Sequence, residues 1–213
     1  ELKQMSQEER VTAFGMRTEQ LTGRSLYIEF EEDEGSNFTY PWAPDVDFNK
    51  RVEIDADEFD TTGANNKIRE LMEEGYGTIV IKNPRGKHSL GVGILSRLNL
   101  IIEGSTGYFG VGLIDGPNVR INGRVGWSCG ENMMSGTIHV KGNASQSAGA
   151  TAHGGTIIID GDASSRCGIS MKGIDIIVKG SVGHMSGFMS QSGNMVVCGD
   201  AGEALGDSLY ETN

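Results

Sequence analysis

The sequence lacks the short motifs by which most catalytic sites are recognised. It contains no Walker-type phosphate loop, no HExxH zinc motif and no GxSxG nucleophile motif. The segment GYFGVG matches the GxGxxG dinucleotide motif only loosely, because its glycines belong to a longer repeat and no helix is predicted after them. A glutaminase of the amino-terminal type would need a cysteine at its start, whereas this chain begins with Glu1. We therefore predict no catalytic residue and no bound cofactor in this chain.

Potential metal ligands are scarce as well. No CxxC pair occurs. Cys129 and Cys167 share one position of the repeat described below, with Ala148 between them, so they should lie roughly 10 Å apart at ~4.8 Å per coil. A disulfide needs Cα atoms within about 7 Å, so we expect free, buried thiols and no metal site. The histidines fall at different positions of the repeat and are not expected to converge: His88, His139, His153 and His184.

Positive charge is also in short supply. The chain has 18 Lys and Arg against 29 Asp and Glu, which gives a net charge of -11. This balance argues against a surface for nucleic acid or anionic membrane, because such surfaces need clustered Lys and Arg. No apolar run approaches the ~18 residues of a membrane span, and no signal-peptide pattern opens the chain. We expect a cytoplasmic protein.

Glycine, in contrast, is abundant and periodic. One glycine recurs with a constant 19-residue period, at Gly104, Gly123, Gly142, Gly161, Gly180 and Gly199. A fixed period of this size is typical of a solenoid, whose units bury their apolar faces only by stacking on one another. Such a repeat is too short for a strand, a crossover helix and a return, since a βαβ unit needs roughly thirty residues or more. The sequence therefore predicts a mainly β fold, a single-stranded right-handed parallel β-helix of about six coils.

A short apolar run precedes each of these glycines and predicts a strand. Two positions of each run, two residues apart, are always aliphatic or Met, so they point to one side of the strand. The first column is Leu100, Val119, Ile138, Ile157, Ile176 and Met195, and the second is Ile102, Ile121, Val140, Ile159, Val178 and Val197. We expect both columns to face the core.

A second set of glycines marks the corners of the coil. Three repeats spell GxxGxxxG (GRVGWSCG, GSVGHMSG and GDAGEALG), and glycine fits where the backbone takes a positive φ or passes close to another segment. Two repeats carry Ser145 and Ser164 at the middle glycine. The first two have paired glycines (GVG), so we expect their corners to bulge differently. The predicted structural glycines are Gly104, Gly123, Gly126, Gly130, Gly142, Gly149, Gly161, Gly168, Gly180, Gly183, Gly187, Gly199, Gly202 and Gly206.

This repeat resembles a known family. From about Thr61 to the end, the 19-residue GxxGxxxG pattern is similar to the carboxy-terminal β-helix domain of the glutamate synthase large subunit. In that family the β-helix holds together a glutamine amidotransferase domain and a synthase domain that binds FMN and an iron-sulfur cluster. As a separate polypeptide, the chain looks most like the β-helix subunit of N-methylglutamate synthase (methylamine-glutamate N-methyltransferase). The resemblance implies a non-catalytic scaffold subunit of a hetero-oligomer, with FMN and the cluster in a partner subunit.

Two other functions stay open. A subunit of formylmethanofuran dehydrogenase is built on the same repeat. An independent binding module is the other alternative, although the sequence reveals no ladder of exposed aromatic residues of the carbohydrate-binding kind. The choice between ammonia and methylamine as the acceptor would be made in a partner subunit.

The residues before the repeat are expected to form an arm and a cap. Within residues 1–50 we expect a short helix at 6–16, a strand at 24–30 and an extended arm at 37–48. In residues 51–85 we expect a strand at 52–56, a helix at 62–74 that stops at Gly75, and a strand at 78–82, which together cap the open end of the β-helix. The β-helix itself should occupy residues 86–213, and its last coil is expected to end at Asn213 before its strand begins.

The outward position between the two core columns suggests a partner surface. It holds Ile101, Arg120 and His139 in the first coils and then Ile158, Ile177 and Val196. Three stacked aliphatic side chains ~4.8 Å apart form an apolar stripe that a soluble protein rarely leaves exposed. We expect Ile158, Ile177 and Val196 to contact a partner subunit. Cover by this chain's own amino-terminal arm is the alternative.

The isolated chain should be inactive. We expect no glutaminase, methyltransferase or glutamate synthase activity from the purified chain alone, because no acid-base pair or nucleophile was found in the sequence. Assays of ammonia release from glutamine and of glutamate or N-methylglutamate formation would test this. Turnover that persists after all other chains have been removed would contradict it.

Overall fold

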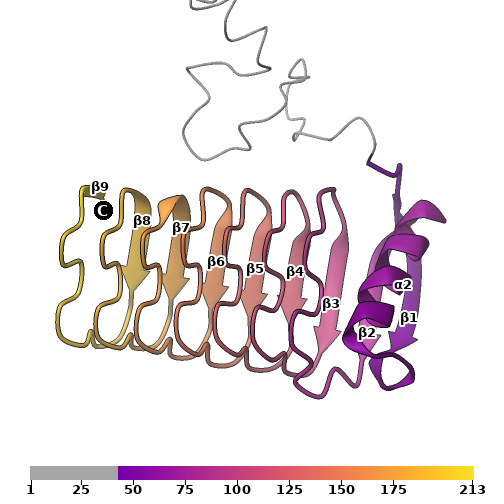
Figure 1. Cartoon of the computed structure of the whole chain (residues 1–213), viewed down its shortest axis with the longest axis horizontal. Helices are drawn as coiled ribbons and strands as arrows, with labels where there is room; N and C mark the ends of the chain where they lie inside the picture. The colour runs from indigo at the N-terminus through magenta and orange to yellow at the C-terminus, as the bar shows by residue number, and fades with distance from the viewer. Residues whose placement is uncertain (1–42) are drawn as a thin grey trace, which may run out of the picture.

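The computed structural model describes residues 43–213, and its strands follow one another along a rod (Figure 1). A short 3-10 helix (Ala56–Glu58) and one α-helix, α2 (Thr61–Glu73), lie near the beginning of this part. The strands are β1 (Asp47–Asp55), β2 (Tyr76–Lys82), β3 (Asn99–Glu103), β4 (Asn118–Ile121), β5 (Thr137–Val140), β6 (Thr156–Ile159), β7 (Lys172–Val178), β8 (Ser192–Val197) and β9 (Glu211–Thr212).

All nine strands form one parallel sheet in sequence order. From β3 to β7 each strand pairs with the next one full repeat later, so that Ile138, for example, lies beside Val119 and Ile157. The predicted mainly β parallel solenoid is therefore confirmed. Parallel strands need a long crossover, and here the rest of each coil supplies it, as residues 122–136 do between β4 and β5.

The two predicted core columns face inward. The residues of both columns on β3 to β7 are buried and belong to one continuous hydrophobic core, while Met195 and Val197 on β8 are partly buried against it. Outside the strands, a second stack pairs by isolated parallel bridges: Val125, Ala144, Ala163, Val182 and Ala201. The first four of these side chains are buried in the same core.

The amino-terminal cap forms as part of the same sheet. β1 pairs with β2, and β2 pairs with β3, each in parallel. Helix α2 buries Ile68, Leu71 and Met72 against the core of the first coils. Asp60 caps the helix, since its carboxylate accepts a hydrogen bond from the Gly63 N–H at 2.6 Å. Gly75 (φ +84°) ends it as expected, because a left-handed residue stops a helix at little cost for glycine.

Several predicted boundaries differ from the structure. β1 begins at Asp47, so the cap starts four residues before the expected boundary at 51 and takes in the end of the predicted arm. Pairing with β2 extends β1 beyond its apolar residues. Strand β2 also begins earlier than expected, at Tyr76 instead of Thr78. The helix and strand expected at 6–16 and 24–30, and residues 37–42 of the arm, lie outside the described residues.

The predicted corner glycines fall into two classes. Gly130 represents the first: its φ is +69°, and Gly149, Gly168, Gly187 and Gly206 repeat that conformation. Gly123 represents the second, because a Cβ there would lie 2.4 Å from the backbone of Gly104 in the preceding coil. The same close approach to the preceding coil occurs at Gly126, Gly142, Gly161, Gly180, Gly183, Gly199 and Gly202. Gly104 itself has φ +140° and lies against Pro84.

The corners of the first two coils keep the backbone pattern of the others, contrary to expectation. Each corner has three left-handed residues at alternate positions, such as Ser128, Gly130 and Asn132 after β4. After β2 they are Ser89, Gly91 and Gly93, and after β3 they are Phe109, Val111 and Leu113. The paired glycines after β3, Gly110 and Gly112, therefore flank the left-handed positions instead of occupying them. The corner after β3 differs from the others only in its residue types. Its left-handed residues Phe109, Val111 and Leu113 are bulky, and this conformation costs each of them roughly 1–2 kcal/mol.

The last coil also goes further than expected. Glu211 and Thr212 form β9 and pair with Ser192 and Gly193 of β8. Backbone hydrogen bonds continue this pairing to Asn213, whose N–H donates to the Gly193 carbonyl at 3.0 Å. The strand of a further coil has thus begun before residue 213.

The two glycine classes should respond differently to alanine. Gly123→Ala forces Cβ into the backbone of the preceding coil and should cost about 3 kcal/mol of unfolding free energy. Gly86→Ala should cost only about 1 kcal/mol, since Gly86 has φ +69° but nothing lies within 4 Å of its added Cβ. Urea unfolding followed by circular dichroism measures both. Equal costs for the two variants would show that close backbone approach does not limit the coil.

Candidate functional site

The outer face of the sheet carries the predicted apolar stripe. The strand register places Ile158, Ile177 and Val196 side by side on β6, β7 and β8. Ile158 and Ile177 are half-buried, and Val196 is 50% exposed. In the neighbouring coils the same position holds Arg120 and His139. The stripe thus lies on the surface of the described residues, as the sequence predicts.

An ion cluster borders this stripe, centred on Asp160 at the end of β6. Lys141 donates a hydrogen bond to one carboxylate oxygen at 2.7 Å, and Lys179 donates to the other at 2.7 Å. His139 Nε2 lies 3.0 Å from the second oxygen. Hydrogen bonds from Lys141, Lys179 and His139, in that order of importance, hold the pKa of Asp160 well below its usual range. The cluster joins three successive coils across the sheet.

A stack of aromatic rings runs along the corners after β2, β3 and β4. The rings of His88 and Tyr108 are 4.5 Å apart between centroids, and those of Tyr108 and Trp127 are 4.8 Å apart, with both pairs nearly parallel. The Tyr108 N–H donates a hydrogen bond to His88 Nδ1 at 2.9 Å. Tyr108 is 42% and Trp127 48% exposed. Exposed aromatic rings are therefore stacked on adjacent coils, which the sequence analysis did not predict, although rings stacked face on face are not a ladder of the carbohydrate-binding kind.

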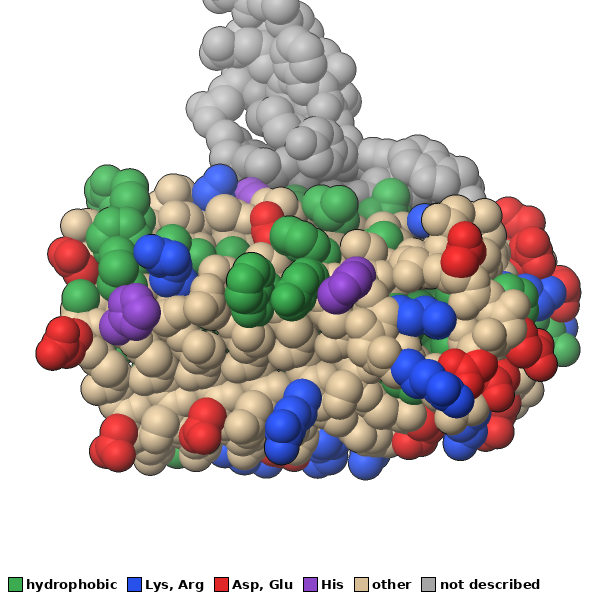
Figure 2. All heavy atoms as spheres, turned by 60° about the horizontal axis from the view of Figure 1, so that its bottom comes forward, with side chains coloured by type: hydrophobic (Ala, Val, Ile, Leu, Met, Phe, Trp, Pro, Cys, Tyr) green, Lys and Arg blue, Asp and Glu red, His purple; other side chains and the backbone are tan. Residues whose placement is uncertain are grey.

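Other exposed apolar side chains lie in the same region. Phe109 is 49% and Leu113 58% exposed, and both belong to the corner after β3. Figure 2 shows hydrophobic side chains gathered beside a histidine near the middle of one face of the rod. The sequence did contain the signal for the stack, because Tyr108 and Trp127 are one full repeat apart and so occupy one coil position. His88 was obscured because it precedes Tyr108 by one residue more than a full repeat.

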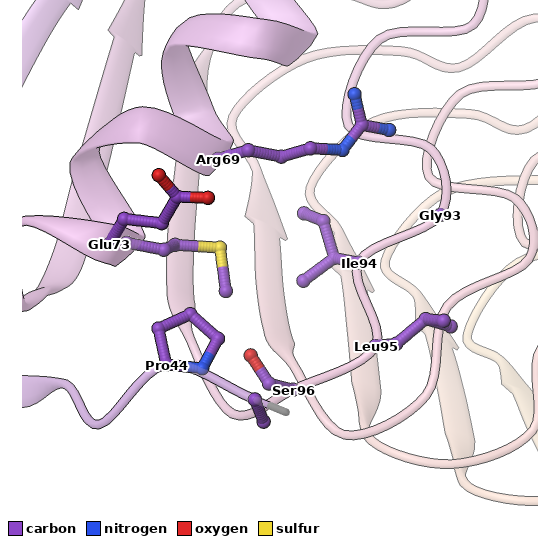
Figure 3. Close-up of a pocket in the computed structure, with 9 residues that line it drawn as sticks. Pro44, Arg69, Glu73, Gly93, Ile94, Leu95 and Ser96 are labelled. Atoms are coloured by element: carbon purple, nitrogen blue, oxygen red, sulfur yellow. The ribbon is translucent and has the colours of Figure 1, made fainter. Parts of the chain in front are cut away.

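A small cavity lies between α2 and the first coil. It measures about 170 Å³ and is lined mainly by apolar side chains, among them Pro44, Met72 and Ile94. The Ser96 hydroxyl is buried and has no hydrogen-bond partner among the described residues. Figure 3 shows the Arg69 guanidinium extending toward Gly93, away from the Glu73 carboxylate. The described lining residues thus bring no nucleophile and base together, and the space suits a few water molecules.

The histidines do not converge within the described part of the chain, but one detail of the expectation was wrong. His88 and His184 occupy the same corner position, since backbone pairing leads from His88 through Tyr108 and Trp127 and on, coil by coil, to His184. Several coils lie between the two histidines, so they are far apart along the rod. His153 Nδ1 is buried without a partner among the described residues, and burial lowers its pKa, with a smaller contribution from Lys172.

The cysteines are free, as predicted. Cys129 and Cys167 are buried, and Cys198 is exposed. Burial raises the pKa of the Cys167 thiol to about 12, and burial with a smaller effect of Cys167 raises the pKa of Cys129 to about 12, so both remain protonated. Among residues 43–213 no group of three or more His, Cys, Asp or Glu side chains is arranged to hold a metal ion.

Comparison with known proteins gives no match for this chain, whether against family models, curated proteins or solved structures. Within the described residues, no helix has the length and apolar character needed to cross a membrane. Two exposed apolar surfaces make up the candidate functional site: the stripe on β6 to β8 and the aromatic stack with Phe109 and Leu113.

The Asp160 cluster should make stability depend on pH. Because the folded pKa of Asp160 lies below the ordinary value of 3.8, its stabilisation is complete above that value and is lost as the pH falls through the folded pKa. Asp160→Asn should lower the unfolding free energy by on the order of 1 kcal/mol at pH 7, and the difference from wild type should shrink toward pH 2. Asp200→Asn, which removes an exposed carboxylate without an ion pair among the described residues, is the control. Thermal unfolding curves at pH 2 to 8 measure both, and equal effects of the two variants at pH 7 would contradict a role for the cluster.

Proposed function

We propose that this chain is the non-catalytic scaffold subunit of a glutamate-synthase-type enzyme, most like N-methylglutamate synthase. In this role it joins a glutamine-amidotransferase-like subunit to a synthase subunit that holds FMN and an iron-sulfur cluster. The chemistry takes place in the partners, and the β-helix fixes their separation. The proposal draws on the resemblance of the 19-residue glycine repeat and on the surface of the rod.

The observation that carries the proposal is the presence of two separate apolar surfaces on one rod. The stripe formed by Ile158, Ile177 and Val196 lies on strands β6 to β8. The aromatic stack lies on the corners after β2 to β4, on other coils and outside the strands. A continuously hydrogen-bonded sheet links the two, so a partner bound at each would be held at a fixed distance. Two binding surfaces on a rigid connector are what a subunit that joins two others requires.

The aromatic stack also favours a second candidate, an independent binding module for carbohydrate. Sugar rings pack on the open faces of aromatic side chains, but the rings of His88, Tyr108 and Trp127 cover one another's faces. Only the ends of such a stack offer a face, so an extended sugar chain would find no row of platforms. Titration with oligosaccharides, followed by Trp127 fluorescence, separates this candidate from the scaffold, which predicts no change.

A subunit of formylmethanofuran dehydrogenase is the remaining alternative. It shares the glycine repeat and the role of a β-helix beside a catalytic subunit, so the surface of this rod fits it as well. The genes next to this one separate the two. Neighbours encoding an amidotransferase and an FMN-dependent synthase support the proposal, whereas genes for a tungsten or molybdenum enzyme favour the alternative.

The stripe should be needed for the complex and not for the fold. Ile177→Asp places a charge at the centre of the stripe, where a bound partner would have to desolvate it, so affinity should fall at least ten-fold. Circular dichroism should show an unchanged fold, because Ile177 lies on the outer face. Co-purification with the amidotransferase-like and FMN-binding subunits measures the effect.

Arg120→Asp is the matched control, because it changes the same outward position in an earlier coil. It should leave the complex intact. A complex that tolerates Ile177→Asp as well as Arg120→Asp would remove the stripe from the interface.

A further inference from the structure

The segment that leads into β3, residues 94–96, lacks the backbone pairing that its equivalents have. In the next coil the Asp115 N–H donates to the Ile94 carbonyl at 2.9 Å, and each later coil repeats this bond. The N–H groups of Leu95 and Ser96 find no such carbonyl among the described residues, because the cap precedes them instead of another coil. The first coil therefore presents unpaired donors on its cap side.

The cavity between α2 and residues 94–96 lies on this unpaired side. It measures about 170 Å³, and its lining is mostly apolar. Ser96 is 6% exposed, yet its hydroxyl has no hydrogen-bond partner among the described residues. Figure 3 shows this hydroxyl pointing into the space between Pro44 and Ile94. The cavity thus combines apolar walls with one buried polar group that needs a partner.

Such a cavity suits one aromatic ring that carries a hydrogen-bond donor. A dry apolar cavity of about 150 Å³ binds benzene, so the space here is large enough for a ring. Most of the lining offers water no partner, whereas a ring would contact the side chains of Met72 and Ile94. A donor on the ring would satisfy the Ser96 hydroxyl, which otherwise stays buried and unpaired.

Trp42 is the aromatic residue that the chain itself brings to this place. Ala43 and Pro44, the first residues that the structure describes, already line the cavity. A trans peptide bond sets consecutive Cα atoms about 3.8 Å apart, so Trp42 starts beside the cavity wall. The indole of a tryptophan has a large apolar body and one N–H donor, which match the walls and the hydroxyl together.

The same proximity disfavours an occupant from another molecule. A side chain tethered to the wall of the cavity has an effective concentration on the order of millimolar or more. A segment of a partner or of a second copy would have to displace it from that position. The covalent connection through Ala43 therefore selects this chain's own amino-terminal segment as the occupant.

We propose that Trp42 inserts its indole ring into the cavity between α2 and residues 94–96 and donates its N–H to the Ser96 hydroxyl. The ring supplies the cover that a preceding coil gives elsewhere, and it anchors the amino-terminal segment to the cap end of the rod. This inference does not depend on the proposed function, since it concerns only contacts within one chain.

The fluorescence of Trp42 tests the inference without a change at the cavity. The chain has two tryptophans, so Trp127→Phe leaves Trp42 as the only one. Its emission in the native protein should lie at a shorter wavelength than in the urea-unfolded chain, and iodide should quench it several-fold less. Native emission and quenching equal to those of the unfolded chain would overturn the inference.

Free indole ties the buried ring to this cavity. Trp42→Ala should lower the urea midpoint of unfolding, because it empties the cavity, and added indole should bind there and restore part of the midpoint. Phe38→Ala, in the same segment, is the matched control. It should leave the midpoint unchanged and create no site for indole. Indole that raises the midpoint of the wild type as much as that of Trp42→Ala would show an unoccupied cavity and contradict the inference.

The hydrogen bond to Ser96 has its own measurement. Ser96→Ala should lower the urea midpoint of the wild type, because the indole N–H then loses its acceptor. In the Trp42→Ala background the same change should be neutral or stabilising, since it removes a buried hydroxyl without a partner. Equal effects in both backgrounds would contradict the proposed bond.

Other occupants give distinct outcomes in these experiments. Trp42 emission that shifts to shorter wavelength only as the protein concentration rises would assign the cavity to a second copy. Buried Trp42 emission combined with indole binding to the wild type would show that this side chain packs elsewhere. Either result would overturn the proposal.

Discussion

Backbone hydrogen bonding between successive coils is the constraint on which the rest of this structure depends. Backbone groups along the strands bond to residues next to their equivalents in a neighbouring coil, as when the Lys141 N–H, directly after β5, donates to the Ile121 carbonyl at 2.9 Å. Keeping this pairing over many coils requires a constant number of residues per turn. Corners such as the one at Gly123 can then follow the preceding corner so closely that a side chain has no room. The glycine repeat and the apolar columns are both consequences of this single geometric requirement.

Hydrogen bonding between coils fixes which residues can occupy the interior. Surface positions where the residue type changes between coils are therefore the best candidates for contacts with other molecules. The core columns vary only among similar apolar residues, whereas the outward position changes from Arg120 and His139 to Ile158 and Ile177. The corner after β3 departs further, with Phe109 and Leu113 where small or polar residues suffice in most coils. Two local departures on a rigid rod suit a connector of other proteins, and the Asp160 cluster beside the stripe stabilises the sheet across three coils.

The fold could be predicted from the sequence almost completely, because a periodic pattern repeats the same evidence in every coil. The inward columns headed by Leu100 and Ile102 and the separation of Cys129 from Cys167 followed from spacing alone. The start of a strand was harder to predict where backbone pairing decides it instead of the side-chain pattern. This is the case at Asp47, where β1 begins, and at Glu211, where β9 begins. The stack of His88, Tyr108 and Trp127 was missed because one extra residue at the first corner breaks the period, and the left-handed backbone of Val111 has no signature in its residue type.

The central claim is that this chain joins two partners that do not hold together without it. Co-expression of the amidotransferase-like subunit with the FMN-binding subunit, with and without this chain, followed by native mass spectrometry, tests it most directly. The account predicts one assembly that contains all three chains, and two separate catalytic subunits when this chain is left out. A complex of the two catalytic subunits that forms equally well in its absence would contradict the account.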